Sequence, residues 1–163
     1  MAMTNCYRMT AIMEHGDQRY GDFPYAVHLA HVEHILAQFG YATAEYRAAA
    51  WLHDILEDTE YPRSSVRKNF GSWVESVVWA CSGFGENRAE RNLCIKEKII
   101  AFPEAAVVKC ADRIANVEFS ANTRKPGIVA MYKRELPAFE EYIRPNVPSQ
   151  MWDRLERSCF DRS

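Results

Sequence analysis

Residues 48–59 read Ala48-Ala49-Ala50-Trp51-Leu52-His53-Asp54-Ile55-Leu56-Glu57-Asp58-Thr59, an apolar run that continues into an imidazole and three carboxylates. The apolar part predicts a buried helix. Residues four apart share a helix face, so we expect His53 to align with Glu57 and Asp54 with Asp58. Buried charges need a partner, and a metal ion is the simplest one for this group.

The same helical pattern continues on both sides of this segment, and no run of alternating strand character competes with it. Gly16-Asp17 and the residues from Gly21 to Pro24 predict a loop. Thr43 is a candidate N-cap, Ser72 is another, and Pro137 should kink or restart its helix. The expected helices span approximately residues 4–14, 25–39, 43–59, 62–70, 72–81, 88–101 and 103–121. After a turn at residues 122–127, a long helix containing Pro137 should end at Pro145 and Pro148, and a final amphipathic helix should carry Trp152 and Leu155. We therefore expect an all-α, single-domain orthogonal cluster of about eight to nine helices.

Composition restricts the class of protein. The 163 residues suit one domain spanning 1–163, and the net charge of −2 offers no basic face for nucleic acid or anionic membrane. The five cysteines are widely spaced and form no CxxC pair, so reduced thiols are expected. The N-terminus has no signal-peptide pattern, and no apolar stretch reaches about 18 residues. These features predict a soluble, cytoplasmic protein; the sequence does not reveal its oligomeric state.

Polar residues stand in three separate apolar helical segments: His28, the pair His53-Asp54, and Asp112. Two imidazoles and two carboxylates suit a borderline divalent ion. We expect manganese, with iron, cobalt and zinc as alternatives and calcium disfavoured. Four protein ligands leave positions for water and substrate, and a bound divalent ion lets water ionise near neutral pH. Glu57 and Asp58, one turn further along, could orient or deprotonate that water.

Each of these residues also has an ordinary structural interpretation. His28 recurs with His31 and His34 on one helix and could be structural, and Asp112 could simply pair with Arg113. Glu57 and Asp58 could form a solvated helix end. The order His, His-Asp, Asp, each in an apolar helix, favours the metal site over these alternatives.

Three motifs resemble the HD-domain metal-dependent phosphohydrolases, and most of all the RelA/SpoT-type hydrolase domains and small alarmone hydrolases. The first runs from His15 to His28 and contains Gln18 and Pro24-Tyr25; the second is His53-Asp54-Ile-Leu-Glu57-Asp58-Thr59. The third is Val108-Lys109-Cys110-Ala111-Asp112-Arg113-Ile-Ala-Asn116. These motifs lie within residues 15–116, and helices within 126–160 would complete the domain.

The resemblance implies a role for each matching residue. His28, His53, Asp54 and Asp112 would hold one metal, usually manganese, and Glu57 and Asp58 would form the acid/base pair. The remaining matches would contact or adjoin the nucleotide: Arg19, Tyr25, Lys109 and Asn116. The implied reaction removes the 3′-pyrophosphate of a guanosine alarmone such as ppGpp. No synthetase segment follows the third motif, so hydrolysis alone is expected.

Two segments depart from the family pattern. Arg19-Tyr20-Gly21 stands where the family has consecutive basic residues, and the segment from Cys81 to Arg88 lacks the family's lysine. Arg88 or Arg91 could replace that lysine. An HD-domain hydrolase of another nucleotide or phosphorylated metabolite is therefore an alternative. A non-catalytic nucleotide-binding regulatory module is another, although binding alone would not need both Glu57 and Asp58.

Overall fold

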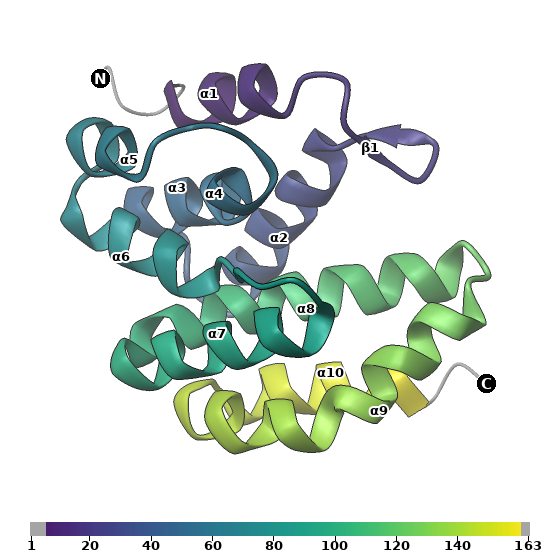
Figure 1. The fold of residues 1–163 in the computed structure, drawn as a ribbon. Helices are drawn as coiled ribbons and strands as arrows, with labels where there is room; N and C mark the ends of the chain where they lie inside the picture. Colours follow the sequence, from purple (N-terminus) through teal and green to yellow (C-terminus); the bar gives the residue numbers. More distant parts are fainter. Residues whose placement is uncertain (1–5, 161–163) are drawn as a thin grey trace.

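The computed structural model describes residues 6–160, which form ten α-helices, two short 3-10 helices and one two-stranded hairpin (Figure 1). The elements are α1 (Cys6–His15), β1 (Arg19–Tyr20), β2 (Phe23–Pro24), α2 (Ala26–Gln38), α3 (Ala44–Leu52), α4 (Ile55–Asp58), α5 (Arg63–Phe70), α6 (Ser72–Cys81), α7 (Arg88–Ala101), η1 (Pro103–Ala105), α8 (Ala106–Asn122), α9 (Pro126–Ile143), η2 (Arg144–Asn146) and α10 (Ser149–Phe160). The all-α prediction is confirmed.

Helix α8 occupies the centre of the molecule. Figure 1 shows the ribbon of α8 crossing the middle, with α1 to α6 on one side and α7, α9 and α10 on the other. It packs against α2, α9 and α10. Its small and branched residues are buried around most of the helix, including Val108, Ala111, Ile114 and Val117. The polar side chains of α8 therefore lie inside the fold, where they need partners.

The core divides into two apolar clusters. The larger one joins α8 to α2, α6, α7, α9 and α10, and Trp152 and Phe139 are among its largest side chains. The smaller one lies under α1, α3 and α4 and includes Tyr7, Leu29 and Ile55. The His28 and His53 side chains are buried within the same fold.

The single helix expected over residues 43–59 is wrong in one important respect. Thr43 does cap α3, accepting a hydrogen bond from the Tyr46 amide. Helical hydrogen bonding is interrupted at His53 and Asp54, however, because α3 ends at Leu52 and α4 begins at Ile55. The Asp54 carbonyl accepts the amides of Glu57 and Asp58 and so starts a new turn. His53 and Asp54 therefore occupy a junction rather than one continuous helix face.

Three smaller expectations also differ from the structure. The predicted loop contains an antiparallel hairpin in which Arg19 pairs with Pro24. Ser72 is the first residue of α6, and Gly71 occupies the N-cap position. Helix α9 continues through Pro137 and does not restart there; buried Leu136 and Phe139 anchor the helix on both sides of the proline. A kink at Pro137 stays a prediction.

Two further expectations concern the state of the cysteines and the presence of membrane-spanning segments. All five cysteine thiols are free, and three of them, Cys81, Cys110 and Cys159, are buried. Among residues 6–160, no helix combines the length and apolar character needed to cross a membrane.

Candidate active site and metal centre

The structure brings the four predicted metal ligands together from α2, the α3–α4 junction and α8. One ligand atom from each of His28, His53, Asp54 and Asp112 lies within 4.8 Å of the others. The His53 Nε2 is 2.9 Å from the Asp54 Oδ2, and the His28 Nε2 is 3.1 Å from the Asp112 Oδ1. Ligand atoms about 2.0–2.2 Å from one ion lie roughly 3–4 Å apart. The spacing of this metal-ligand cluster fits a single ion.

The electrostatics of the cluster also favour a cation. Burial alone would raise the pKa of Asp54 and Asp112, but the neighbouring cations hold both values well below the usual range. Burial would lower the pKa of His53, and the two carboxylates raise it well above the ordinary value. The buried carboxylates therefore favour positive charge between them, which a divalent ion can supply in place of imidazole protons.

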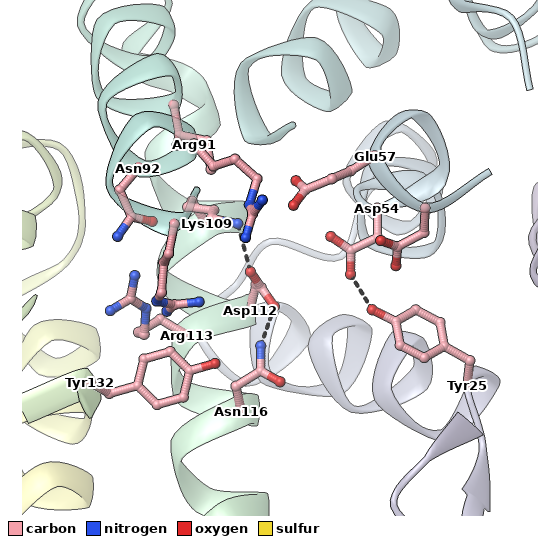
Figure 2. A pocket seen from close by; sticks show the side chains of 13 residues that line it. Tyr25, Asp54, Glu57, Arg91, Asn92, Lys109, Asp112, Arg113, Asn116 and Tyr132 are labelled. Atoms are coloured by element: carbon pink, nitrogen blue, oxygen red, sulfur yellow. Dashed lines mark hydrogen bonds and ion pairs between the residues drawn. The ribbon is translucent and has the colours of Figure 1, made fainter. Parts of the chain in front are cut away.

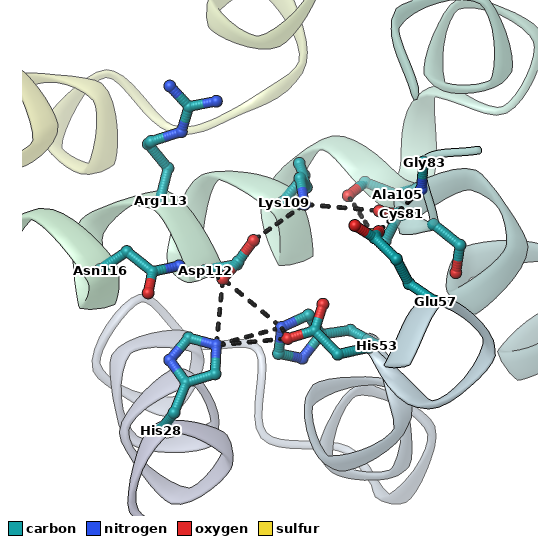
Figure 3. A network of polar contacts seen from close by, with 12 residues as sticks. His28, His53, Glu57, Cys81, Gly83, Ala105, Lys109, Asp112, Arg113 and Asn116 are labelled. Atoms are coloured by element: carbon teal, nitrogen blue, oxygen red, sulfur yellow. Dashed lines mark hydrogen bonds and ion pairs between the residues drawn. The ribbon is translucent and has the colours of Figure 1, made fainter. Parts of the chain in front are cut away.

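Hydrogen bonds orient the ligands. The His53 Nδ1 lies 2.7 Å from the Ala50 carbonyl, so it is the donor and leaves Nε2 with a lone pair that faces the cluster. The Tyr25 hydroxyl donates to Asp54, and the Asn116 amide donates to the Asp112 Oδ1 at 2.7 Å. Lys109 donates to the Asp112 Oδ2 at 2.9 Å (Figure 3). Three of the four residues expected at the nucleotide, Tyr25, Lys109 and Asn116, are thus hydrogen-bonded to predicted metal ligands.

The proposed acid/base pair lies beside this cluster. Glu57 and Asp58 both line a pocket of about 160 Å³ that also exposes Asp54 and Asp112. The Glu57 Oε2 accepts the Gly83 amide at 2.8 Å, and the Asp58 Oδ2 accepts the Gln18 side-chain amide at 2.8 Å. Burial raises the pKa of Glu57, although Lys109 and the Gly83 amide oppose that rise. A raised pKa suits a carboxyl group that must exchange protons near neutral pH.

The opposite side of the pocket is basic. Figure 2 shows Arg91 and Asn92 of α7, Arg113 of α8 and Tyr132 of α9 facing the carboxylates across the pocket. We call the side formed by Arg88, Arg91, Lys109 and Arg113 the cationic wall. Sequence reasoning named Arg88 and Arg91 only as substitutes for a lysine and gave Arg113 no binding role.

The cations of this wall differ in how they are paired. The Glu135 carboxylate on α9 accepts from Arg88 at 2.5 and 3.0 Å, from Arg113 at 2.9 Å and from Asn92 at 3.2 Å. The alternative of an Asp112–Arg113 ion pair is therefore not what the structure has: Arg113 pairs with Glu135, and Asp112 pairs with Lys109. Arg91 has no carboxylate partner among residues 6–160; its guanidinium contacts only the Gly85 carbonyl, at 3.4 Å. Arg91 is consequently the arginine of the wall with an unmatched charge.

The hairpin contributes a different residue from the one expected. Arg19 is exposed, bonds to the Asp22 carbonyl and does not line the pocket. Its neighbour Tyr20 turns inward instead: its ring lies 4.8 Å from that of His28 and 4.0 Å from that of Phe119. The Tyr20 hydroxyl donates to the Asn116 Oδ1 at 3.0 Å. The alternation of side chains in a strand could have indicated that only one of these neighbours faces inward.

A helical domain with a buried His/Asp cluster and adjoining carboxylates defines the class of this protein. A family model described as HD domain matches residues 6–138. The chain therefore belongs to the HD domain family, and its His/Asp cluster can hold a metal ion.

The chain is also similar in sequence to several known proteins. It is 32% identical over 119 residues to a GTP pyrophosphokinase of Streptomyces coelicolor, covering 68% of this chain and 14% of that protein. It is 32% identical over 111 residues to a guanosine-3′,5′-bis(diphosphate) 3′-pyrophosphohydrolase of Aquifex aeolicus, covering 64% and 16%. This chain therefore corresponds to a small part of these long relatives.

A solved structure has the same fold along the whole chain. It is described as a metazoan ortholog of SpoT that hydrolyzes ppGpp, and the TM-score is 0.79 at 21% identity. The match covers 100% of this chain and 97% of that one.

Proposed function

We propose that this protein is a metal-dependent phosphohydrolase that removes the 3′-pyrophosphate of a guanosine alarmone such as ppGpp. One observation carries the proposal: a single pocket joins the metal-ligand cluster, the carboxylates of Glu57 and Asp58, and a cationic wall. That combination suits an anionic substrate that is attacked by water. Similarity to the Aquifex aeolicus pyrophosphohydrolase supports this choice of substrate.

In this proposal His28, His53, Asp54 and Asp112 hold one divalent ion, which we take to be manganese, with iron, cobalt or zinc as alternatives. When bound, the ion lowers the pKa of a water and polarises a phosphoryl oxygen. Tyr25, Asn116 and Lys109 act mainly by fixing Asp54 and Asp112, because their side chains donate to those carboxylates. A nucleotide contact for Arg19 remains part of the prediction, although its side chain lies outside the pocket.

The protein's own carboxyl groups would manage the protons. The water oxygen bonds to the phosphorus attached to the ribose 3′-oxygen, and the bond between that phosphorus and the 3′-oxygen breaks. Glu57 or Asp58 accepts a proton from the water, and a proton is delivered to the departing nucleoside oxygen. Groups acting in this way typically contribute about 10²–10⁴-fold in rate.

Arg91 is our candidate for the main phosphate-binding side chain of the cationic wall. Arg88 and Arg113 are already paired with Glu135, and Lys109 is paired with Asp112. An arginine forms bidentate hydrogen bonds with phosphate oxygens. Arg91 can do so without giving up a carboxylate partner within the described residues, and so we infer that it replaces the lysine missing after Cys81.

Hydrolysis of ppGpp tests the function directly. The purified protein with manganese should release pyrophosphate and GDP, and EDTA should abolish the release. Glu57→Gln should lower kcat by about 10²–10⁴-fold while metal content is retained. Glu140→Gln, a change at a partly exposed position on α9 outside the pocket, is the matched control and should leave kcat unchanged.

Other outcomes would select the alternatives. Metal-dependent turnover of other nucleotides with ppGpp untouched would indicate an HD-domain hydrolase with a different substrate. Tight nucleotide binding without turnover would indicate a regulatory module. A single domain over residues 1–163 and a cytoplasmic location complete the proposal; limited proteolysis and cell fractionation would test these two points.

A further inference from the structure

The side chains of Lys98 and Glu57 are hydrogen-bonded to opposite ends of one backbone peptide group. The Lys98 Nζ donates to the Ser82 carbonyl at 2.8 Å, and the Gly83 amide donates to the Glu57 Oε2 at 2.8 Å. That carbonyl and that amide belong to the same peptide group, between Ser82 and Gly83. Lys98 and Glu57 therefore interact through the backbone, although Lys98 lies outside the set of residues that line the pocket.

The geometry of the peptide group couples the two side chains. No cis peptide bond occurs among residues 6–160, so the Ser82 carbonyl and the Gly83 amide point in opposite directions. An ammonium group on the oxygen polarises the peptide and strengthens its amide as a donor, because hydrogen bonds in a chain reinforce one another. The amide in turn is directed at the carboxylate of Glu57.

Lys98 is itself held firmly at the C-terminal end of α6. Its ammonium group also donates to the Trp79 carbonyl at 3.3 Å and lies 3.7 Å from the centre of the Trp79 ring. No carboxylate forms a salt bridge with Lys98 within the described residues. Its charge is matched instead by the carbonyls at the end of α6, where the helix dipole is negative.

The peptide group also has little room to move. A Cβ on Gly83 would lie 2.9 Å from the Arg91 carbonyl oxygen and 3.0 Å from Ile95, so the backbone here rests directly on α7. Figure 3 shows the Gly83 amide near Glu57, at the opposite end of the polar network from His28. The contact with α7 and the bond from Lys98 fix the position from which Gly83 reaches Glu57.

We propose that Lys98 is a positioning residue for the acid/base chemistry, acting on Glu57 through the Ser82–Gly83 peptide group. This inference rests on the proposed function for its kinetic consequence. The arrangement of Lys98, the peptide and Glu57 can be tested without it.

The kinetic test compares two lysines of α7. Lys98→Met should lower kcat about 10-fold, with KM and metal content unchanged, and Lys98→Arg should restore part of the loss. Lys96→Met is the matched control, because Lys96 pairs with the exposed Glu141 of α9 and with no other carboxylate within residues 6–160. In a Glu57→Gln background, Lys98→Met should change kcat by less than about 2-fold, because coupled residues are not additive. An equal loss in both backgrounds would overturn the proposal.

A second measurement does not depend on turnover. The chain has seven glycines, and Gly83 is the one that follows a serine, so ¹⁵N-glycine labelling combined with ¹³C-carbonyl serine labelling assigns its amide without a substitution. Lys98→Met and Glu57→Gln should each shift the Gly83 amide proton upfield and speed its hydrogen exchange, whereas Lys96→Met should not. An unmoved Gly83 resonance in Lys98→Met would refute the coupling. A wild-type protein inactive on ppGpp with the expected shifts would refute only the proposed substrate.

Discussion

The two sides of the pocket are built in different ways. The metal-ligand cluster takes its side chains from α2, the α3–α4 junction and α8, and its charges are buried and matched by one another. The cationic wall draws mainly on α7 and α8 and depends on one carboxylate, Glu135, that reaches it from α9. The first side is suited to chemistry that needs a fixed geometry. The second can change its charge balance through a single residue, which suits substrate selection.

The largest effect should come from the metal-ligand cluster. Asp54→Asn removes one anionic ligand, and because the ion supplies several kcal/mol of transition-state stabilisation, activity should fall by about 10³-fold or more. Elemental analysis should show loss of bound metal. Manganese should raise the melting temperature of the wild type but not of the variant, because only a protein that binds the ion is stabilised by it. An active, metal-loaded Asp54→Asn protein would contradict the assignment.

The cationic wall should affect binding rather than chemistry. Arg91→Gln removes the unpaired guanidinium, and since a hydrogen bond to a charged group contributes about 1.5–3 kcal/mol, KM for ppGpp should rise about 10- to 100-fold. Metal content should not change. Arg88→Gln is the comparison variant; its smaller effect on KM is expected because Glu135 already holds Arg88. Equal effects of both changes would remove the distinction between the paired and unpaired arginines.

The contrast between the two sides of the pocket also explains which site residues could be predicted from the sequence. His28, His53, Asp54 and Asp112 interrupt apolar runs, so burial could be predicted locally and the need for a common partner followed from it. Glu135 and Lys98 lie on amphipathic helices and look like surface charges. Their partners are distant in sequence: Arg88 is 47 residues from Glu135, and Ser82 is 16 residues from Lys98. No local pattern contains such pairings.

The errors at the α3–α4 junction and in the hairpin have the same origin. The run from Ala48 to Leu52 favours one long helix, and nothing in its propensity requires the turn at His53 and Asp54. Arg19 matched a basic position in the family pattern. The hairpin instead places Tyr20 against His28 and Phe119, an outcome decided by tertiary packing.

A residue that only orients a metal ligand should have an intermediate effect. Tyr25→Phe removes the hydroxyl that donates to Asp54 while keeping the ring against His15. Loss of such a partner typically costs about 10–100-fold in metal affinity or activity, and we expect about 10-fold. Titration with manganese should show a weaker Kd and near-normal kcat at saturating metal. A raised KM with an unchanged Kd for manganese would instead assign Tyr25 to the nucleotide.

The smallest effect should be on stability, away from both sides of the pocket. Glu118 on α8 accepts two hydrogen bonds from Arg154 on α10, at 2.9 and 3.0 Å. Burial alone would raise the pKa of Glu118, but Arg154 lowers it below the ordinary value. The stabilisation is therefore complete above the ordinary glutamate pKa of about 4.3 and is lost as the pH falls through the lower folded-state pKa.

Glu118→Gln should accordingly reduce the free energy of unfolding by about 1–2 kcal/mol near neutral pH and by less below about pH 4. Glu140→Gln is the matched control, since Glu140 pairs with Arg144 at the exposed end of α9, where solvent screens the charges and the pair contributes little to stability. Urea denaturation at the two pH values measures the difference. Because Glu118 does not line the pocket, kcat should be unchanged. A stability difference that stays constant with pH would show that the packing of α10, rather than the charge of Glu118, holds it against α8.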